Sequence, residues 1–220
     1  MLNPSVGHNG TQTAFINMTM SKKGLYAITD FDRLDDQAVI ERSEVMLKSG
    51  ISMLQYRNKN DAAKKSTVLT LQELCKTYNT PFIINDDIEL AHRIKADGVH
   101  LGKSDKSLSK ARDFLGSVII GKSCYNDLEI AINAHEADYV AFGAFYPSQT
   151  KPGAVKASIS LLEQAKPKIN KPIVVIGGIT PDNGKVLVEA GADMLAVITA
   201  LYGSEDIVNT LQRFKSFLHY

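Results

Sequence analysis

From Gly24 onward, short apolar runs alternate with longer stretches in which apolar residues recur at helical spacing. The short runs are rich in β-branched residues and alternate little between apolar and polar positions, which is typical of parallel strands covered on both faces. Eight runs of this kind predict strands at 24–29, 52–56, 81–85, 98–101, 118–123, 138–143, 172–177 and 194–198. The helical spacing predicts helices at 35–48, 61–78, 86–95, 105–114, 126–136, 158–168, 181–190 and 204–218.

Each predicted strand is followed by a predicted helix, and parallel strands need such crossover connections. Eight strand–helix units in 220 residues predict an α/β protein with one domain, a closed (β/α)₈ TIM barrel. An open doubly wound sheet is the alternative, but the turn after Ile28 lacks the glycine-rich GxGxxG pattern that such sheets usually carry. Residues 1–22 are polar and show no periodicity, so we expect a flexible extension there and the barrel at 23–220.

Composition narrows the class of protein further. The chain has 25 basic and 24 acidic residues, which argues against a surface built for nucleic acid or for an anionic membrane. No apolar run is long enough to cross a bilayer, and the start shows no secretory signal, so we expect a cytoplasmic protein. Cys75 and Cys124 show no metal-binding spacing, and we expect no disulfide between them.

In a barrel of this kind, the carboxyl ends of the strands meet at one rim, where active sites lie. Gln55, Arg57 and Lys59 follow the second predicted strand at intervals of two, so they share one side of an extended segment. Such a segment alone is more often a solvated loop. Its position at a strand end instead favours an anionic ligand held by two cations and an amide.

Acidic residues follow the third and fourth predicted strands. Asp86 and Asp105 offer the hard oxygen ligands that Mg²⁺ prefers, so they form the candidate metal pair. The alternative is helix capping, because Asp87 and Asp105 stand directly before helical patterns. His100 is either a hydrogen-bond donor in a pocket or a buried core histidine.

Two further segments suit anions. Ser148, Thr150 and Lys151 lie in a long segment after the sixth strand that is typical of a loop closing over an anion, although a plain surface loop has the same composition. After the seventh and eighth strands, the backbone amides of Gly178, Ile198 and Thr199 are candidates for a monophosphate site. A tight turn is the alternative for the glycine.

These segments together resemble the thiamine-phosphate synthase family, also called thiamine-phosphate pyrophosphorylase. The resemblance covers about residues 24–205 and rests on seven short motifs in the family's order. They are LQYRNK (54–59), NDD (85–87), GVHLGKSD (98–105), GKS (121–123), YPSQTK (146–151), GGI (177–179) and VIT (197–199).

The resemblance implies a Mg²⁺-dependent transfer between small molecules. A pyrimidinylmethyl diphosphate is joined to hydroxyethylthiazole phosphate, which gives thiamine phosphate and pyrophosphate. The diphosphate would contact Gln55, Arg57, Lys59, Asn85, Ser123 and Lys151; Mg²⁺ would bind Asp86 and Asp105; the thiazole phosphate would contact Ser148, Thr150, Gly178, Ile198 and Thr199; and His100 is grouped with the substrate-binding residues. Of these, Arg57, Lys59, Ser123 and Lys151 would act directly on the leaving group.

The sequence differs from the family's usual residues at two positions, and both substitutions keep a hydroxyl. Ser148 stands where a threonine is frequent, and Thr199 stands where a serine is frequent. A thiazole tautomerase resembles this family but carries a histidine shortly after the serine of the fifth strand, where this chain has Cys124 and Tyr125. A non-catalytic phosphate sensor would tolerate loss of the aspartates and of Lys151, and a phosphosugar isomerase would need no QxRxK segment. The oligomeric state, a homo-oligomer included, and the carboxylation of the thiazole acceptor stay open.

Overall fold

The computed structural model of the chain describes residues 20–59, 65–102, 108–147 and 157–218. All eight predicted strands are present, each is parallel to its neighbours, and β8 pairs with β1 to close the barrel in chain order. The (β/α)₈ prediction is therefore confirmed. The strands are β1 (Gly24–Ile28), β2 (Met53–Tyr56), β3 (Phe82–Asn85), β4 (Gly98–Leu101), β5 (Ile119–Tyr125), β6 (Tyr139–Gly143), β7 (Ile173–Ile176) and β8 (Met194–Val197).

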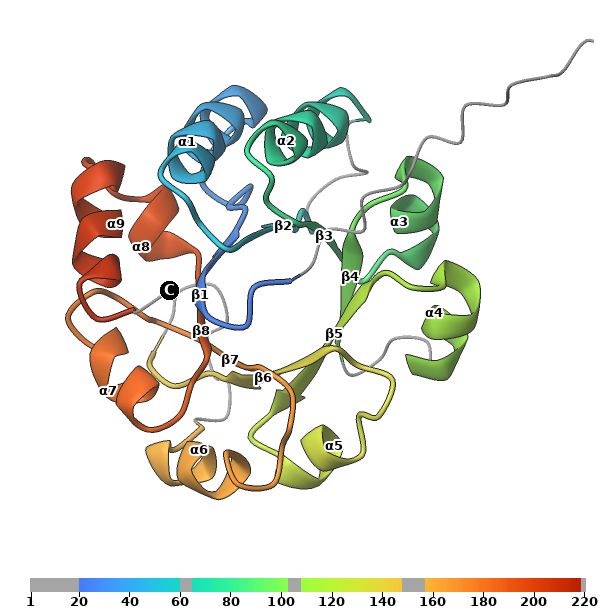
Figure 1. Cartoon of the computed structure of the whole chain (residues 1–220). Coiled ribbons are helices and arrows are strands. Elements are labelled where there is room, and N and C mark those ends of the chain that lie inside the picture. The colour runs from blue at the N-terminus through green and yellow to red at the C-terminus, as the bar shows by residue number, and fades with distance from the viewer. Residues whose placement is uncertain (1–19, 60–64, 103–107, 148–156, 219–220) are drawn as a thin grey trace, which may run out of the picture.

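Helices surround the barrel as an outer layer (Figure 1). They are α1 (Asp36–Lys48), α2 (Lys65–Thr77), α3 (Ile88–Ile94), α4 (Leu108–Leu115), α5 (Leu128–Ile132), α6 (Ile159–Ala165), α7 (Gly184–Glu189), α8 (Thr199–Tyr202) and α9 (Ile207–Lys215). No helix in the described part of the chain is long and apolar enough to span a membrane.

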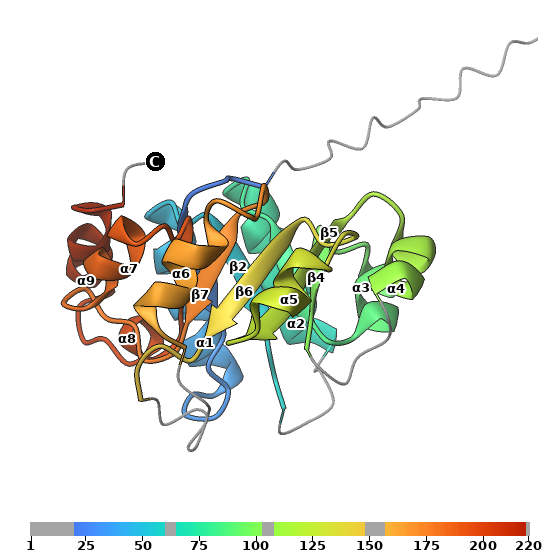
Figure 2. The same ribbon diagram turned by 90° about the horizontal axis from the view of Figure 1, so that it is seen from below.

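Most helix boundaries lie one to four residues from the predicted positions, and the structure adds one short helix. The helix predicted from Pro181 begins three residues later, because the Asn183 side chain accepts a hydrogen bond from Thr180 N and holds a turn there. The short helix α8 was not predicted, because four residues are too few to show a period. It follows β8 directly, at the same edge of the molecule toward which the β6 arrow points (Figure 2).

Two apolar clusters fill the molecule. The larger lies between the strands and the helices, and the smaller fills the barrel interior with alternate residues of the strands. The interior cluster consists of Tyr26, Ile28, Met53, Ile83, Ile119, Tyr139, Ala141, Val174, Met194 and Ala196. Met20 also packs against it; residues 1–19 lie outside the described residues, so the flexible extension stays a prediction. Because the interior is filled, a ligand site of this barrel belongs at a rim.

The amino-terminal rim is held by aspartates that stand directly before even-numbered strands. Each accepts a hydrogen bond from a backbone amide at the start of the preceding odd-numbered strand, which satisfies a donor that would otherwise be buried. The pairs are Asp97 with Phe82 N at 2.9 Å, Asp138 with Ile120 N at 2.7 Å and Asp193 with Ile173 N at 2.9 Å. This rim therefore contributes to stability.

We expect Asp193→Ala to lower the free energy of unfolding by about 1–3 kcal/mol, because it leaves the buried amide of Ile173 without its acceptor. Urea unfolding measures the change. The matched control is Asp113→Ala on the exposed face of α4, for which we expect a change within about 0.5 kcal/mol. Equal losses in the two variants would contradict this role of Asp193.

Candidate active site

Four predicted site residues lie at the carboxyl ends of adjacent strands. Gln55 is on β2, Asn85 ends β3, His100 is on β4 and Ser123 is on β5. Each lies two or four residues after a position on the inner face of the same strand. Because successive side chains of a strand point to opposite faces, all four point toward the barrel axis. The register pairs Asn85 with His100, which sets these two side chains next to each other.

Gln55 and His100 are both hydrogen-bonded to buried tyrosines. Gln55 is 2% exposed, and its Nε2 donates to the Tyr26 hydroxyl at 2.7 Å. The His100 ring lies between two hydroxyls, with Nδ1 3.0 Å from Tyr139 Oη and Nε2 2.9 Å from Ser123 Oγ. His100 is half-buried and both of its ring nitrogens have protein partners, so these contacts fit both alternatives, a hydrogen-bond donor in a pocket and a core histidine.

The segment after β2 is hydrogen-bonded to the residue that follows β1. The Thr29 hydroxyl accepts a hydrogen bond from Arg57 N at 2.8 Å and donates to the Arg57 carbonyl at 3.1 Å. The Arg57 side chain is 13% exposed, and its Nη1 lies 3.9 Å from a carboxylate oxygen of Asp32. Lys59 is exposed. The backbone that carries the two cations is thus fixed at Arg57, while the Lys59 side chain extends into solvent.

The two neighbouring aspartates after β3 have different environments. Asp87 caps α3, because its carboxylate accepts hydrogen bonds from the second and third backbone amides of that helix at 3.1 and 2.8 Å. Asp86 caps no helix. Its Oδ2 accepts from Asn85 Nδ2 at 2.6 Å and its Oδ1 from Gly102 N at 3.2 Å, so this exposed carboxylate connects the ends of β3 and β4.

The loop after β7 packs closely against the loop after β6. Gly178 has a φ of 60°, and a Cβ there would lie 2.4 Å from the carbonyl oxygen of Pro147. Only glycine combines this backbone conformation with such a close approach. The side chain of Asn183 then donates to the Gly178 carbonyl at 3.0 Å. The carboxyl ends of β6 and β7 are therefore in backbone contact.

Beside β8, the sequence analysis missed a cation. Ile198 and Thr199 lie where α8 begins, and no side-chain cap occupies the start of this helix. Arg33 Nη2 donates to Thr199 Oγ1 at 2.8 Å, and the same guanidinium pairs with the buried Asp30. The signal for this cation in the sequence is an aspartate and an arginine three residues apart after the first strand.

These contacts connect strand ends around most of the rim. They join β8 with β1 through Arg33, β1 with β2 through Thr29, β3 with β4 through Asp86, β4 with β5 through His100, and β6 with β7 through Gly178. Asp105, Ser148, Thr150 and Lys151 lie outside the described residues. Within the described ranges, no three acidic, histidine or cysteine side chains gather as a metal site.

The different environments of Asp86 and Asp87 lead to a prediction about stability. We expect Asp87→Ala to lower the free energy of unfolding by about 1 kcal/mol, the typical cost of losing a helix N-cap. Asp86→Asn should cost less, because asparagine tolerates the positive φ of this position and keeps an acceptor oxygen. Urea unfolding of the two variants checks the order, and a larger loss in Asp86→Asn would contradict it.

Comparisons with known proteins identify the family of this chain. The family model described as thiamine monophosphate synthase matches residues 25–201. Thiamine-phosphate synthase of Nitrosococcus oceani is 48% identical over 195 residues, which covers 86% of this chain and 90% of the relative. Thiamine-phosphate synthase of Nitrosomonas eutropha is 47% identical over 197 residues and covers 87% and 92%.

Solved structures give the same result. Thiamine phosphate pyrophosphorylase from Pyrococcus furiosus superimposes with a TM-score of 0.78 at 31% identity, over 89% of this chain and 95% of that one. A (S)-3-O-geranylgeranylglyceryl phosphate synthase from Thermoplasma acidophilum, at 18% identity and a TM-score of 0.65 over 89% and 93% of the two chains, shares the fold alone. With a family model matched across nearly the whole barrel and relatives close to half identical, the chain belongs to the thiamine monophosphate synthase family.

Proposed function

We propose that this chain is a thiamine-phosphate synthase. It transfers the 4-amino-2-methyl-5-pyrimidinylmethyl group from its diphosphate to hydroxyethylthiazole phosphate, and pyrophosphate leaves. The observation that carries this proposal is the run of contacts around the carboxyl rim, from Arg33 and Thr199 to Arg57, Asp86 and Gly178. It brings groups suited to two phosphorylated ligands to one end of the barrel.

The two anionic ligands would bind at opposite sides of this rim. The backbone amides of Gly178, Ile198 and Thr199 would hold the thiazole phosphate, since the β7 and β8 ends are the usual phosphate site of this fold. Arg33 lies close enough to Thr199 to add positive charge there. We assign Ser148 and Thr150 to the same phosphate on the family's motif alone.

The diphosphate would bind on the β2 to β5 side. Gln55, Asn85 and Ser123 supply polar contacts from the inner faces of these strands. Arg57 and Lys59 supply positive charge from the loop that follows β2. Lys151 joins them by the family's motif.

The donors at the β3 end fit Mg²⁺. Asp86 is an exposed carboxylate, a hard oxygen ligand, and Asn85 and Gly102 hold it in one orientation. Asp86 and Asp105 would hold the ion. When bound, Mg²⁺ would neutralise charge on the diphosphate oxygens and so make pyrophosphate a better leaving group.

In the reaction, the bond between the pyrimidine methylene carbon and the diphosphate oxygen breaks, and its electron pair leaves with pyrophosphate. The lone pair of the thiazole nitrogen then forms the new C–N bond, which leaves the positive charge on the thiazolium ring. Arg57, Lys59 and Lys151 stabilise the charge that develops on the departing diphosphate, and Ser123 donates a hydrogen bond to it. No proton has to be removed from either substrate.

The direct test mixes the purified protein with both phosphorylated substrates, with and without Mg²⁺, and follows pyrophosphate and thiamine phosphate together. We expect both products in equal amounts with the metal and neither after chelation. No product from both substrates with Mg²⁺ would refute the synthase function. Product after chelation would refute the metal assignment of Asp86 and Asp105.

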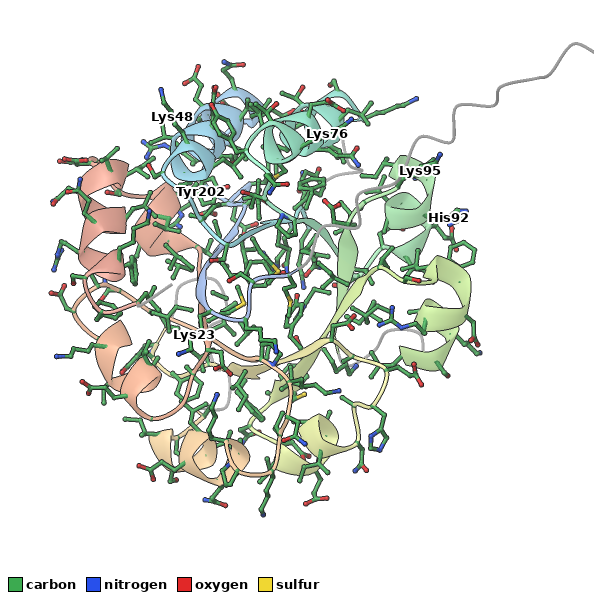
Figure 3. The ribbon with its side chains drawn as sticks, viewed as in Figure 1. Lys23, Lys48, Lys76, His92, Lys95 and Tyr202 are labelled. Atoms are coloured by element: carbon green, nitrogen blue, oxygen red, sulfur yellow. The ribbon has the colours of Figure 1, made fainter. Side chains whose placement is uncertain are left out.

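We expect Arg57→Ala and Lys151→Ala each to lower kcat by about 10²–10³, the usual effect of removing one group that stabilises transition-state charge. The matched control is Lys48→Ala, at an exposed position at the end of α1 (Figure 3), which should keep its turnover. Steady-state kinetics with both substrates measures the difference. Unchanged kcat in Arg57→Ala and Lys151→Ala would overturn their assigned role.

A further inference from the structure

A chain of hydrogen bonds crosses the barrel interior and connects two parts of the proposed diphosphate site. It uses one side chain from each of five strands, and two of its members, Tyr26 and Tyr139, belong to the otherwise apolar interior cluster. The distances are Gln55 Nε2 to Tyr26 Oη, 2.7 Å; Tyr26 Oη to Tyr139 Oη, 2.9 Å; Tyr139 Oη to His100 Nδ1, 3.0 Å; and His100 Nε2 to Ser123 Oγ, 2.9 Å.

The number of protons available determines which group donates in each of these hydrogen bonds. Gln55 donates its amide N–H to Tyr26, so the one proton of Tyr26 goes to Tyr139, the other hydroxyl within reach. The opposite direction would leave that buried proton without an acceptor among the described residues, and no buried polar side-chain atom there lacks a partner. Tyr139 therefore donates to His100 Nδ1.

His100 then carries its own proton on Nε2 and donates it to Ser123 Oγ. Ser123, which is half-buried, accepts at its oxygen and keeps its hydroxyl proton for a third group. With the other tautomer, Nε2 would instead accept the Ser123 proton, and the serine would present only lone pairs to an anion. The tautomer of His100 thus decides whether Ser123 attracts or repels a diphosphate.

Burial keeps the two tyrosine hydroxyls protonated, as this series of hydrogen bonds requires. Burial raises the pKa of Tyr26 and of Tyr139 above the usual range for tyrosine, so both hydroxyls keep their protons near neutral pH. Both side chains are nearly inaccessible, at 1% and 0% exposed. Water does not compete for these hydrogen bonds.

Gly121 makes room for the contact between Tyr139 and His100. A Cβ at this position would lie 2.1 Å from the Tyr139 ring and 2.6 Å from His100 Nδ1. The two rings stack over it with centroids 5.6 Å apart. A glycine in the middle of β5 usually weakens a strand, and here it leaves space for this pair of rings.

We propose that Tyr26 and Tyr139 are positioning residues for the transfer: they hold His100 as its Nε2–H tautomer, so that the Ser123 hydroxyl donates to the departing diphosphate. This proposal rests on the proposed function for the role of Ser123. The tautomer itself is a property of the protein without substrate.

The first experiment is nitrogen-15 NMR of the His100 ring in the full chain without substrates, with His100→Asn identifying the signals. We expect a protonated Nε2 and an unprotonated Nδ1 in the unsubstituted protein. Tyr139→Phe should shift the population toward the other tautomer, because Nδ1 loses its donor. A protonated Nδ1 as the main form of the unsubstituted protein would overturn the proposal, whatever the enzyme activity.

The second experiment is a double-mutant cycle on kcat. We expect Tyr139→Phe and Tyr26→Phe each to lower kcat about tenfold, the effect of one lost hydrogen bond, with the KM for the thiazole phosphate unchanged. In a Ser123→Ala background, Tyr139→Phe should lower kcat by less than about twofold, because its effect passes through Ser123. A full tenfold loss in both backgrounds would show a purely structural role and overturn the proposal.

Ser43→Ala is the matched control. Ser43 on α1 is buried, and its hydroxyl lies 2.7 Å from that of Tyr202, which is in the helical layer (Figure 3). This variant also leaves a buried tyrosine hydroxyl without its partner, but both residues are on helices and neither is on the strands β2 to β5 of the proposed diphosphate site, so it should keep its kcat. If it loses as much kcat as Tyr139→Phe, the proposal fails. If the unsubstituted protein is inactive with both substrates, the proposed function fails, while the NMR result still decides the tautomer.

Discussion

Eight parallel strands pair in chain order, and the pairing of β8 with β1 closes them into a ring. Because all strands run the same way, each contributes its carboxyl end to the same rim, and residues more than 100 positions apart in the chain become neighbours there. Arg33 and Thr199 show the effect, since the closing pair of strands brings their side chains within hydrogen-bond distance. Without closure, the two ends of the chain would lie at opposite edges of an open sheet, and the proposed phosphate site would lose its cation.

The two rims of the barrel serve different purposes. At the amino-terminal rim, Asp97, Asp138 and Asp193 accept hydrogen bonds from strand amides. At the carboxyl rim, Asp86 is exposed and no side chain caps the start of α8. This division is the usual one for barrels, in which one end contributes stability and the other carries function. Between the rims, the interior cluster is apolar except for the hydroxyls of Tyr26 and Tyr139, which carry a hydrogen-bonded connection across it.

Much of this could be predicted from the sequence, for a physical reason. Buried parallel strands have an apolar signature, and once they are located, the rim residues follow by position, so Gln55, Asn85 and Ser123 were predicted at strand ends and lie there. Asp87 was a capping candidate because it stands directly before a helical pattern, and it caps α3. The contact of Asp86 with the end of β4 could not be predicted, because it depends on a backbone conformation with positive φ and on a neighbouring strand. The tyrosine pair was also missed. Tyr26 and Tyr139 look like ordinary core residues in their strands, and only the closed barrel brings their hydroxyls together.

The proposed function requires that both phosphorylated ligands bind at one rim, on opposite sides of a shared site. The most direct measurement is a crystal structure of the protein with thiamine phosphate, pyrophosphate and Mg²⁺. We expect pyrophosphate beside Arg57 and Ser123, and the phosphate of thiamine phosphate at the amides of Gly178 and Thr199. A structure with either ligand at the amino-terminal rim, or with the two phosphates exchanged, would contradict this expectation.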